Sequence, residues 1–302
     1  MSFAIIFSGQ GMQHAAMLPW LADDELVERT RAELGVIDWR THLNDAGWAS
    51  RNANAQVLLT GLALAAWTQL SRALPPPAAV AGYSVGELAS FAAAGVFDAG
   101  MAITLAGTRA RAMDRCAAAT PGGLLAVSGL PPARIERLCD ASGAAVAIDN
   151  GSHAVVLGGP LAALDAAERA AQAAGAHCTR LKVDVASHTP WMQAAADEFA
   201  RALSTLPLRS PRVPLFSNAA DRVTTAAQAA RALALQIATT VQWSACMDQI
   251  RARQVGCVLE IGPGAALARM WNERFPDVPA RSVDEFRSAS AIVDWVLRNG
   301  SG

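Results

Sequence analysis

Three short apolar runs of this chain end in glycine-containing turns, and a helix-forming segment follows each turn. The runs cover residues 3–7, 78–81 and 257–261, and the turns are Gly9-Gln10-Gly11, Gly82-Tyr83-Ser84-Val85-Gly86 and Gly262-Pro263-Gly264. A strand that leads into a tight turn and then into a helix is the repeating unit of α/β folds. The pattern therefore predicts an α/β protein with a parallel sheet, whose edge loops carry side chains into a cleft.

The composition narrows the class of protein. Of 302 residues, 52% are hydrophobic and 17% are charged, which is enough apolar material for a large core and excludes a disordered chain. A formal net charge of −1 without a basic cluster gives no support for binding nucleic acid or a membrane surface. The five cysteines lack CxxC spacing, so we expect reduced thiols rather than a metal site or disulfides.

The apolar segments fit a cytoplasmic protein. The N-terminal run lacks a basic region before it and is expected to be a strand rather than a signal peptide. The most apolar stretch, residues 57–70, contains polar residues and is shorter than the ~20 residues that span a bilayer. We expect it to form a buried helix.

Residues 121–185 differ from the chain on either side in their pattern of expected strands and helices. Their pattern predicts the order strand, helix, strand, strand, helix, strand, which is the ferredoxin-like arrangement. We therefore expect a small ferredoxin-like domain over 121–185, inserted into a large catalytic domain that consists of residues 1–120 and 186–302.

Ser84 stands in a Gly-x-Ser-x-Gly turn between an apolar run and a helix, which is the context of a nucleophile elbow. The turn forces the serine into a strained backbone conformation, and a side chain at either glycine would collide with the neighbouring strand or helix. The helix N-terminus then favours negative charge near the hydroxyl. The alternative is a chance match in a chain rich in glycine and alanine.

A serine nucleophile needs a base, and the chain has five histidines. His188 follows a predicted strand and precedes a helix, where loops project into clefts, whereas His14 follows the first glycine turn. Both are candidates for the base on position alone, and His188 is as consistent with a structural histidine as with a base. The other histidines are expected on the surface or in the small domain: His42, His153 and His177.

Arg109 lies in a predicted helix on a row with Leu105 and Met113, since residues four apart share a helix face. An arginine on an apolar row either extends its head group to solvent or binds an anion. A buried guanidinium suits bidentate recognition of a carboxylate.

Taken together, the motifs resemble the malonyl-CoA:acyl carrier protein transacylase family over residues 3 to about 275. The matching segments are Gly9-Gln10-Gly11-Met12-Gln13, Gly82-Tyr83-Ser84-Val85-Gly86-Glu87, Arg109, Ser187-His188, Val241-Gln242-Trp243 and Leu259-Glu260-Ile261-Gly262-Pro263-Gly264. The resemblance implies a hydrolase-like core with a ferredoxin-like small domain.

The resemblance also implies roles for individual residues. Ser84 is the expected nucleophile, His188 the general base and acid, and Arg109 the clamp for the substrate carboxylate. Backbone N–H groups of Gln10 and Val85 are expected to form the oxyanion hole, and the backbone carbonyl of Gln236 to orient the histidine.

The implied reaction moves a malonyl group from malonyl-CoA, through an ester on Ser84, to the thiol of a phosphopantetheine-type arm on an acyl carrier protein. No metal or bound cofactor is expected. The chain has no carrier-type Asp-Ser-Leu motif, so the acceptor is expected to be a separate protein.

Two residues depart from the family pattern, and one of them resembles a particular branch. Relatives usually have proline where this chain has Ser8 and histidine where it has Tyr83. Tyr83, together with the run Ala186-Ser187-His188-Thr189-Pro190, resembles the epsilon subunit of bacterial malonate decarboxylase, which loads the carrier subunit of the decarboxylase. Asn150 matches a family asparagine, but the residues expected near Ser152 and Ala154 are missing and His153 stands between them.

Four alternatives remain at this point. A malonyl transacylase of fatty-acid or polyketide synthesis has the same motifs, and Val185-Ala186-Ser187-His188 also resembles enzymes that accept branched malonyl groups. A serine esterase or thioesterase usually places its histidine later in the chain. A scaffold subunit without activity needs none of Ser84, His188 and Arg109.

Overall fold

The computed structural model describes residues 2–151 and 154–300, and its strands form two sheets. The larger has the order β11-β10-β1-β2-β7-β8; neighbours pair in parallel from β11 to β7, and β8 is antiparallel to β7. This confirms the α/β class. The strands are β1 (Phe3–Phe7), β2 (Ala79–Gly82), β7 (Leu215–Phe216), β8 (Arg222–Val223), β10 (Cys257–Ile261) and β11 (Ala280–Ser282).

The central strands of the larger sheet are buried on both faces, as expected for parallel strands covered by helices. Because successive side chains of a strand point to opposite faces, Phe3, Ile5 and Phe7 of β1 face one core. Ala4 and Ile6 face a second core on the other side of the sheet.

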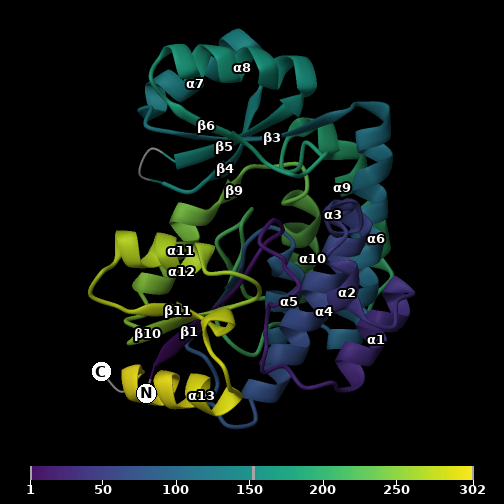
Figure 1. Ribbon diagram of the computed structural model, residues 1–302, viewed down its shortest axis with the longest axis vertical. Helices are drawn as coiled ribbons and strands as arrows, with labels where there is room; N and C mark the ends of the chain where they lie inside the picture. The colour runs from purple at the N-terminus through teal and green to yellow at the C-terminus, as the bar shows by residue number, and fades with distance from the viewer. Residues whose placement is uncertain (1, 152–153, 301–302) are drawn as a thin grey trace.

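Most helices cover the first face of this sheet (Figure 1). They are α1 (Glu25–Leu34), α2 (Trp39–His42), α3 (Ala46–Ser50), α4 (Asn52–Leu70), α5 (Gly86–Ala93), α6 (Ala99–Ala119), α9 (Gln193–Ser204), α10 (Ala226–Leu235) and α13 (Ala289–Asn299). The second face is covered by α11 (Trp243–Arg251) and α12 (Ala266–Arg274). Within the described ranges, no helix combines the length and apolar character needed to cross a bilayer.

The smaller sheet has the order β6-β3-β5-β4-β9. Its strands are β3 (Gly122–Ser128), β4 (Ala145–Asp149), β5 (Ala154–Pro160), β6 (His177–Arg180) and β9 (Val241–Gln242). Helices α7 (Pro132–Ser142) and α8 (Leu161–Ala173) cover its outer face (Figure 1). Its inner face contributes Leu124, Ala147 and Val156 to the second core, so the two sheets share packed side chains.

Strand β9 is a difference from the sequence expectation. It comes from residues 241–242, far beyond the segment 121–185, and pairs in parallel with β4 through Ile148 and Asp149. A two-residue strand is too short to show a period-2 pattern, so it could not be predicted from the alternation of apolar residues.

The helix expected from about Met12 does not form. Residues 12–24 form turns and irregular segments. Pro19 disfavours helical backbone at Leu18, which has a left-handed conformation with φ 50° instead. The first helix, α1, begins only at Glu25, where the Asp24 side chain accepts hydrogen bonds from the N–H groups of Leu26 and Val27. By contrast, the helix predicted around Arg109 forms as α6, and Asp98 caps it in the same way.

Candidate active site

Ser84 lies in the turn between β2 and α5 and has φ 54°, a left-handed conformation that is strained for a residue with a side chain. Both flanking glycines are required by packing. A Cβ on Gly82 would lie 2.1 Å from the carbonyl oxygen of Gly86, and a Cβ on Gly86 would lie 2.4 Å from the carbonyl oxygen of Phe7 in β1. The expected strain and the expected collisions with strand and helix are both confirmed.

His188 faces Ser84, with 2.7 Å between its Nε2 and the serine Oγ. Its Nδ1 lies 2.5 Å from the backbone carbonyl oxygen of Gln236. Because a carbonyl oxygen only accepts, Nδ1 carries the hydrogen, and Nε2 of the neutral ring is left to accept from the Ser84 hydroxyl. The arrangement is a serine–histidine pair whose third member is a backbone carbonyl, where a hydrolase triad has a carboxylate.

The surroundings of His188 keep the ring neutral. The side chain is fully buried, and burial lowers the pKa of His188 to about 3, helped by the positive charge of Arg109 and opposed by the Gln236 carbonyl. The ring is therefore neutral at neutral pH, with its single hydrogen on Nδ1, and Nε2 is free to accept a proton. His188 itself has φ 63°, so both members of the pair sit on strained backbone.

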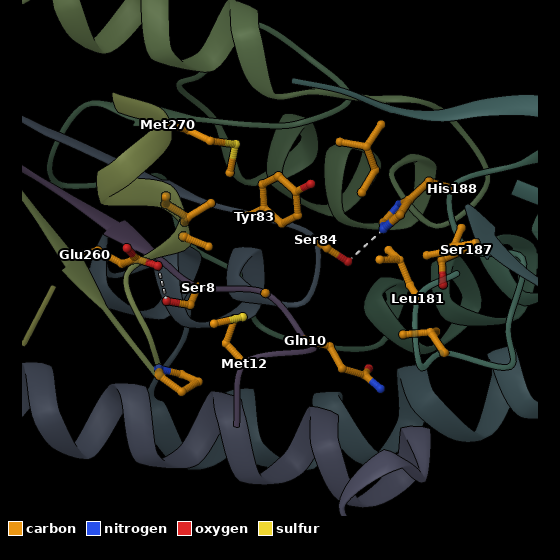
Figure 2. Close-up of a pocket in the computed structure, with 17 residues that line it drawn as sticks. Ser8, Gln10, Met12, Tyr83, Ser84, Leu181, Ser187, His188, Glu260 and Met270 are labelled. Carbon is orange, nitrogen blue, oxygen red and sulfur yellow. Dashed lines mark hydrogen bonds between the residues drawn. The ribbon is translucent and has the colours of Figure 1, made fainter. Parts of the chain in front are cut away.

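A cavity of about 190 Å³ opens beside the pair. Figure 2 shows Ser84 and His188 toward one end, Ser8 and Glu260 toward the other, and Tyr83 and Met270 between them. The cavity is lined by Ser8, Gly9, Gln10, Met12, Tyr83, Ser84, Leu124, Ile148, Leu181, Val183, Ser187, His188, Glu260, Pro263, Ala266, Leu267 and Met270. The lining draws on both sheets.

The Ser8 hydroxyl donates to Glu260 Oε1 at 2.8 Å, and the N–H of Ala268 donates to Oε2 at 2.8 Å. Burial raises the pKa of Glu260 to about 7 in spite of these hydrogen bonds. Ser8 thus gives the Glu260 carboxyl a hydrogen-bond donor on the wall of the cavity.

The backbone N–H groups of Gln10 and Val85 donate to no acceptor within the described part of the chain. Gln10 lines the cavity in the turn after β1, and Val85 directly follows Ser84 at the start of α5. The two free donors therefore belong to the two turns that flank the serine hydroxyl.

Arg109 lies outside the cavity lining, which is a difference from a simple carboxylate clamp. Its guanidinium is fully buried, with Nη1 donating to Gln56 Oε1 at 2.7 Å and Nη2 to Gln236 Oε1 at 3.0 Å. Burial lowers the pKa of Arg109 to about 10, and the negative charge of Glu87 opposes this. The Gln236 side chain thus separates the guanidinium from Ser84.

The other candidate base, His14, lies elsewhere. Its Nε2 is 2.9 Å from Asp284 Oδ2, and its side chain is half exposed. His42 packs beside Trp48, and His177 is the first residue of β6. His153 and Ser152 lie outside the described residues. The structure thus brings only His188 to Ser84 among the histidines that it describes.

Sequence comparison places the chain in a family. A family model described as the acyl transferase domain matches residues 4–293. The chain belongs to the acyltransferase family.

The similarity of this acyltransferase to known proteins extends over nearly its whole length. The malonyl CoA-acyl carrier protein transacylase of Salmonella typhimurium is 32% identical over 304 residues, covering 96% of this chain and 98% of the relative. An acyl-carrier-protein S-malonyltransferase structure from Burkholderia pseudomallei superposes with a TM-score of 0.89 at 27% identity, covering 97% of this chain and 100% of the other. The structure of a type II PKS acyl-carrier protein in complex with its malonyl-transacylase also matches, with a TM-score of 0.89 at 28% identity, covering 97% and 99%.

Sequence reasoning missed three buried polar residues of the acyltransferase. Gln56 holds Arg109, Glu87 accepts a hydrogen bond from the backbone of Asn218, and Asn218 contacts Ser84. Asn218 follows the carboxyl end of β7, and parallel sheets often place site residues at such positions. This position is the feature of the sequence that could have identified Asn218 as a site residue.

The lowered pKa of His188 predicts a flat pH profile. Labelling of Ser84 by a serine-directed fluorophosphonate should stay within about 2-fold between pH 8 and pH 5, since a base with a depressed pKa remains unprotonated there. Labelling rates followed by intact mass, with circular dichroism at each pH, measure this. A midpoint near ~6.5, the value of an exposed histidine, contradicts the prediction.

Proposed function

We propose that this acyltransferase moves a malonyl group from malonyl-CoA to the thiol of a separate carrier protein, through an ester on Ser84. The observation that carries the proposal is the hydrogen-bonded line Ser84–His188–Gln236 carbonyl at the wall of a cavity. The names of the relatives support malonyl as the acyl group and an acyl carrier protein as acceptor.

In the first half-reaction, Ser84 Oγ attacks the thioester carbonyl while His188 Nε2 takes the hydroxyl proton. A bond forms between Oγ and the carbonyl carbon, and the carbonyl electrons move to its oxygen. The N–H groups of Gln10 and Val85 donate to that oxyanion, each such donor contributing a few kcal/mol. The intermediate then collapses, the carbon–sulfur bond breaks, and CoA leaves as a thiol with the proton from His188.

The second half-reaction repeats these steps in reverse. The thiol of the carrier arm gives its proton to His188 and attacks the Ser84 ester, and Ser84 leaves with the proton. Ping-pong kinetics follow from the shared ester intermediate. The steps use only groups of the protein, malonyl-CoA and the carrier arm.

We assign the malonyl carboxylate to Arg109. Within the described residues, the cavity lining contains no lysine or arginine, so Arg109 behind Gln236 is the cation nearest to Ser84 through a single side chain. Binding requires the Gln56 or Gln236 amide to release one guanidinium nitrogen to the carboxylate. Exchanging a neutral amide for a carboxylate strengthens the hydrogen bond to Arg109, which favours that release.

We further propose the carrier subunit of malonate decarboxylase as the acceptor, with a carrier of fatty-acid or polyketide synthesis as the alternative. Tyr83 and the run Ala186-Ser187-His188-Thr189-Pro190 support the choice, and Tyr83 lines the cavity, as does the other departing residue, Ser8. Tyr83 packs edge-on against Trp243 and donates to Asn150 Oδ1 at 3.1 Å, and Ser8 donates to Glu260.

For the domain organisation, we propose that residues 121–185 form a ferredoxin-like unit inserted into a hydrolase-like domain of residues 1–120 and 186–302. The supporting observations are the chain order β3-α7-β4-β5-α8-β6 and the spatial order β6-β3-β5-β4. Both helices lie on one face of that sheet.

If the ester forms on Ser84, the mass of the protein should increase, and the increase should require Oγ of Ser84. Mixing the protein with malonyl-CoA should add one malonyl group, and Ser84→Ala should abolish the addition while circular dichroism stays unchanged. Intact mass and peptide mapping measure this. An adduct that survives Ser84→Ala contradicts the mechanism.

Arg109 should decide which acyl group is accepted. Arg109→Ala should lower malonyl transfer about 100-fold or more, because the carboxylate is left buried without a partner and each ~1.4 kcal/mol is tenfold in rate. Acetyl transfer should hold or rise, and Arg109→Lys should rescue only partly, since lysine lacks the planar fork. Equal loss of both activities would show that Arg109 only supports the fold.

The identity of the acceptor is tested by comparing the rates of transfer to two carriers. Transfer from malonyl-loaded protein to a carrier whose arm derives from dephospho-CoA should be faster than transfer to a fatty-acid carrier with a phosphopantetheine arm. Quenched-flow mass analysis of both carriers measures the rates. Equal or faster transfer to the fatty-acid carrier would favour lipid synthesis.

A further inference from the structure

Two side-chain amides hold the backbone of Ser84 from opposite sides. Oδ1 of Asn218 accepts from the Ser84 N–H at 2.8 Å, and Nε2 of Gln236 donates to the Ser84 carbonyl at 2.8 Å. Ser84 is the strained residue of the turn, with φ 54°. Both polar groups of its backbone are thus bonded to side chains that come from distant parts of the chain.

Asn218 is fixed in place by its own backbone. It is completely buried, its N–H donates to Glu87 Oε1 at 2.5 Å, and its carbonyl accepts from the Gln242 N–H at 3.0 Å. It is therefore tied both to α5, which follows Ser84, and to β9 of the smaller sheet. Such a residue has little freedom to move.

The Asn218 amide extends the ladder between β2 and β7 beyond its end. The strands pair in parallel through Val80–Leu215 and Ala81–Phe216, and the backbone pairing then stops. Where the chain turns away, Nδ2 of Asn218 donates to the Gly82 carbonyl at 2.7 Å while Oδ1 accepts from Ser84. A primary amide has the donor and the acceptor of a peptide group, so it can bond both sides of the turn.

We propose that Asn218 is a positioning residue for the reaction, acting through Ser84, with the Gln236 side chain as its counterpart. The inference rests on Ser84 being the nucleophile of the proposed function. A left-handed serine persists only where its surroundings over-determine it. Without the Asn218 bonds, the turn relaxes and Oγ leaves the 2.7 Å contact with His188 Nε2. A displacement of ~1 Å in a reacting atom can cost 10²-fold in rate.

The chain offers a control for the loss of an asparagine amide with a similar hydrogen-bond pattern, at an exposed position rather than a buried one. The side chain of Asn272 in α12 likewise donates to one backbone carbonyl and accepts from one backbone N–H, both of Ala280, at 2.9 Å and 2.8 Å. Asn272 does not line the cavity. Its removal takes away the same kind of hydrogen bonds without touching Ser84.

The test compares Asn218→Ala with Asn272→Ala in the whole protein. Both should lower the Tm, Asn218→Ala by more, because Asn218 is completely buried and Asn272 is exposed. Only Asn218→Ala should lower the maximal rate of malonyl-ester formation, about 100-fold, with KM within about 3-fold, and it should slow fluorophosphonate labelling similarly. Asn272→Ala should stay within about 2-fold in rate. If Asn218→Ala does not fold, Asn218→Ser takes its place, because serine keeps a polar group there but is too short to reach Ser84.

The possible outcomes distinguish a failure of the proposed role of Asn218 from a failure of the proposed malonyl transfer. Folded Asn218 variants that react at the wild-type rate overturn the inference, as does an equal loss of rate in Asn272→Ala. Wild-type protein that forms no malonyl ester overturns the proposed function instead. In that case fluorophosphonate labelling of Ser84 still decides whether Asn218 positions the hydroxyl.

Discussion

The left-handed conformation of Ser84 is the constraint on which the site depends. It points the hydroxyl out of the turn between β2 and α5, and it exists only because two glycines let α5 approach β1 closely. Everything else at the site is arranged around that fixed oxygen. His188 meets it from a second strained residue, and the free N–H groups of Gln10 and Val85 come from the two adjoining turns.

The buried charges give the site its electrostatic character. Burial raises the pKa of Glu87 to about 7, and the positive Arg109 guanidinium opposes that shift. The same guanidinium helps to keep the His188 ring neutral. Gln236 connects these groups, since its backbone carbonyl holds the histidine while its side chain lies between Arg109 and Ser84. A substrate carboxylate that reaches Arg109 therefore acts on the same residue that orients His188.

Local patterns in the sequence predicted the parts of the structure that depend on neighbouring residues. The glycine turn around Ser84 and the helix around Arg109 were predicted because a turn and a helix are local features. The contact between Ser84 and His188 was anticipated from motifs. The enclosure of Arg109 was not, because its position on a helix says nothing about Gln56, which packs against it from another helix. Asn218 belongs to no motif that was recognised, and its function depends on three segments that meet only in the folded chain.

Strand β9 has a mechanical consequence. It belongs in sequence to the chain that supports the larger sheet, yet it is hydrogen-bonded into the smaller one, and both sheets contribute to one core. A hinge motion that separated the larger sheet from the smaller one would break the β4–β9 pairing. It would also expose packed side chains such as Leu124 and Trp243. Such an opening is costly, so the cavity beside Ser84 has to be reached while the two sheets stay packed together.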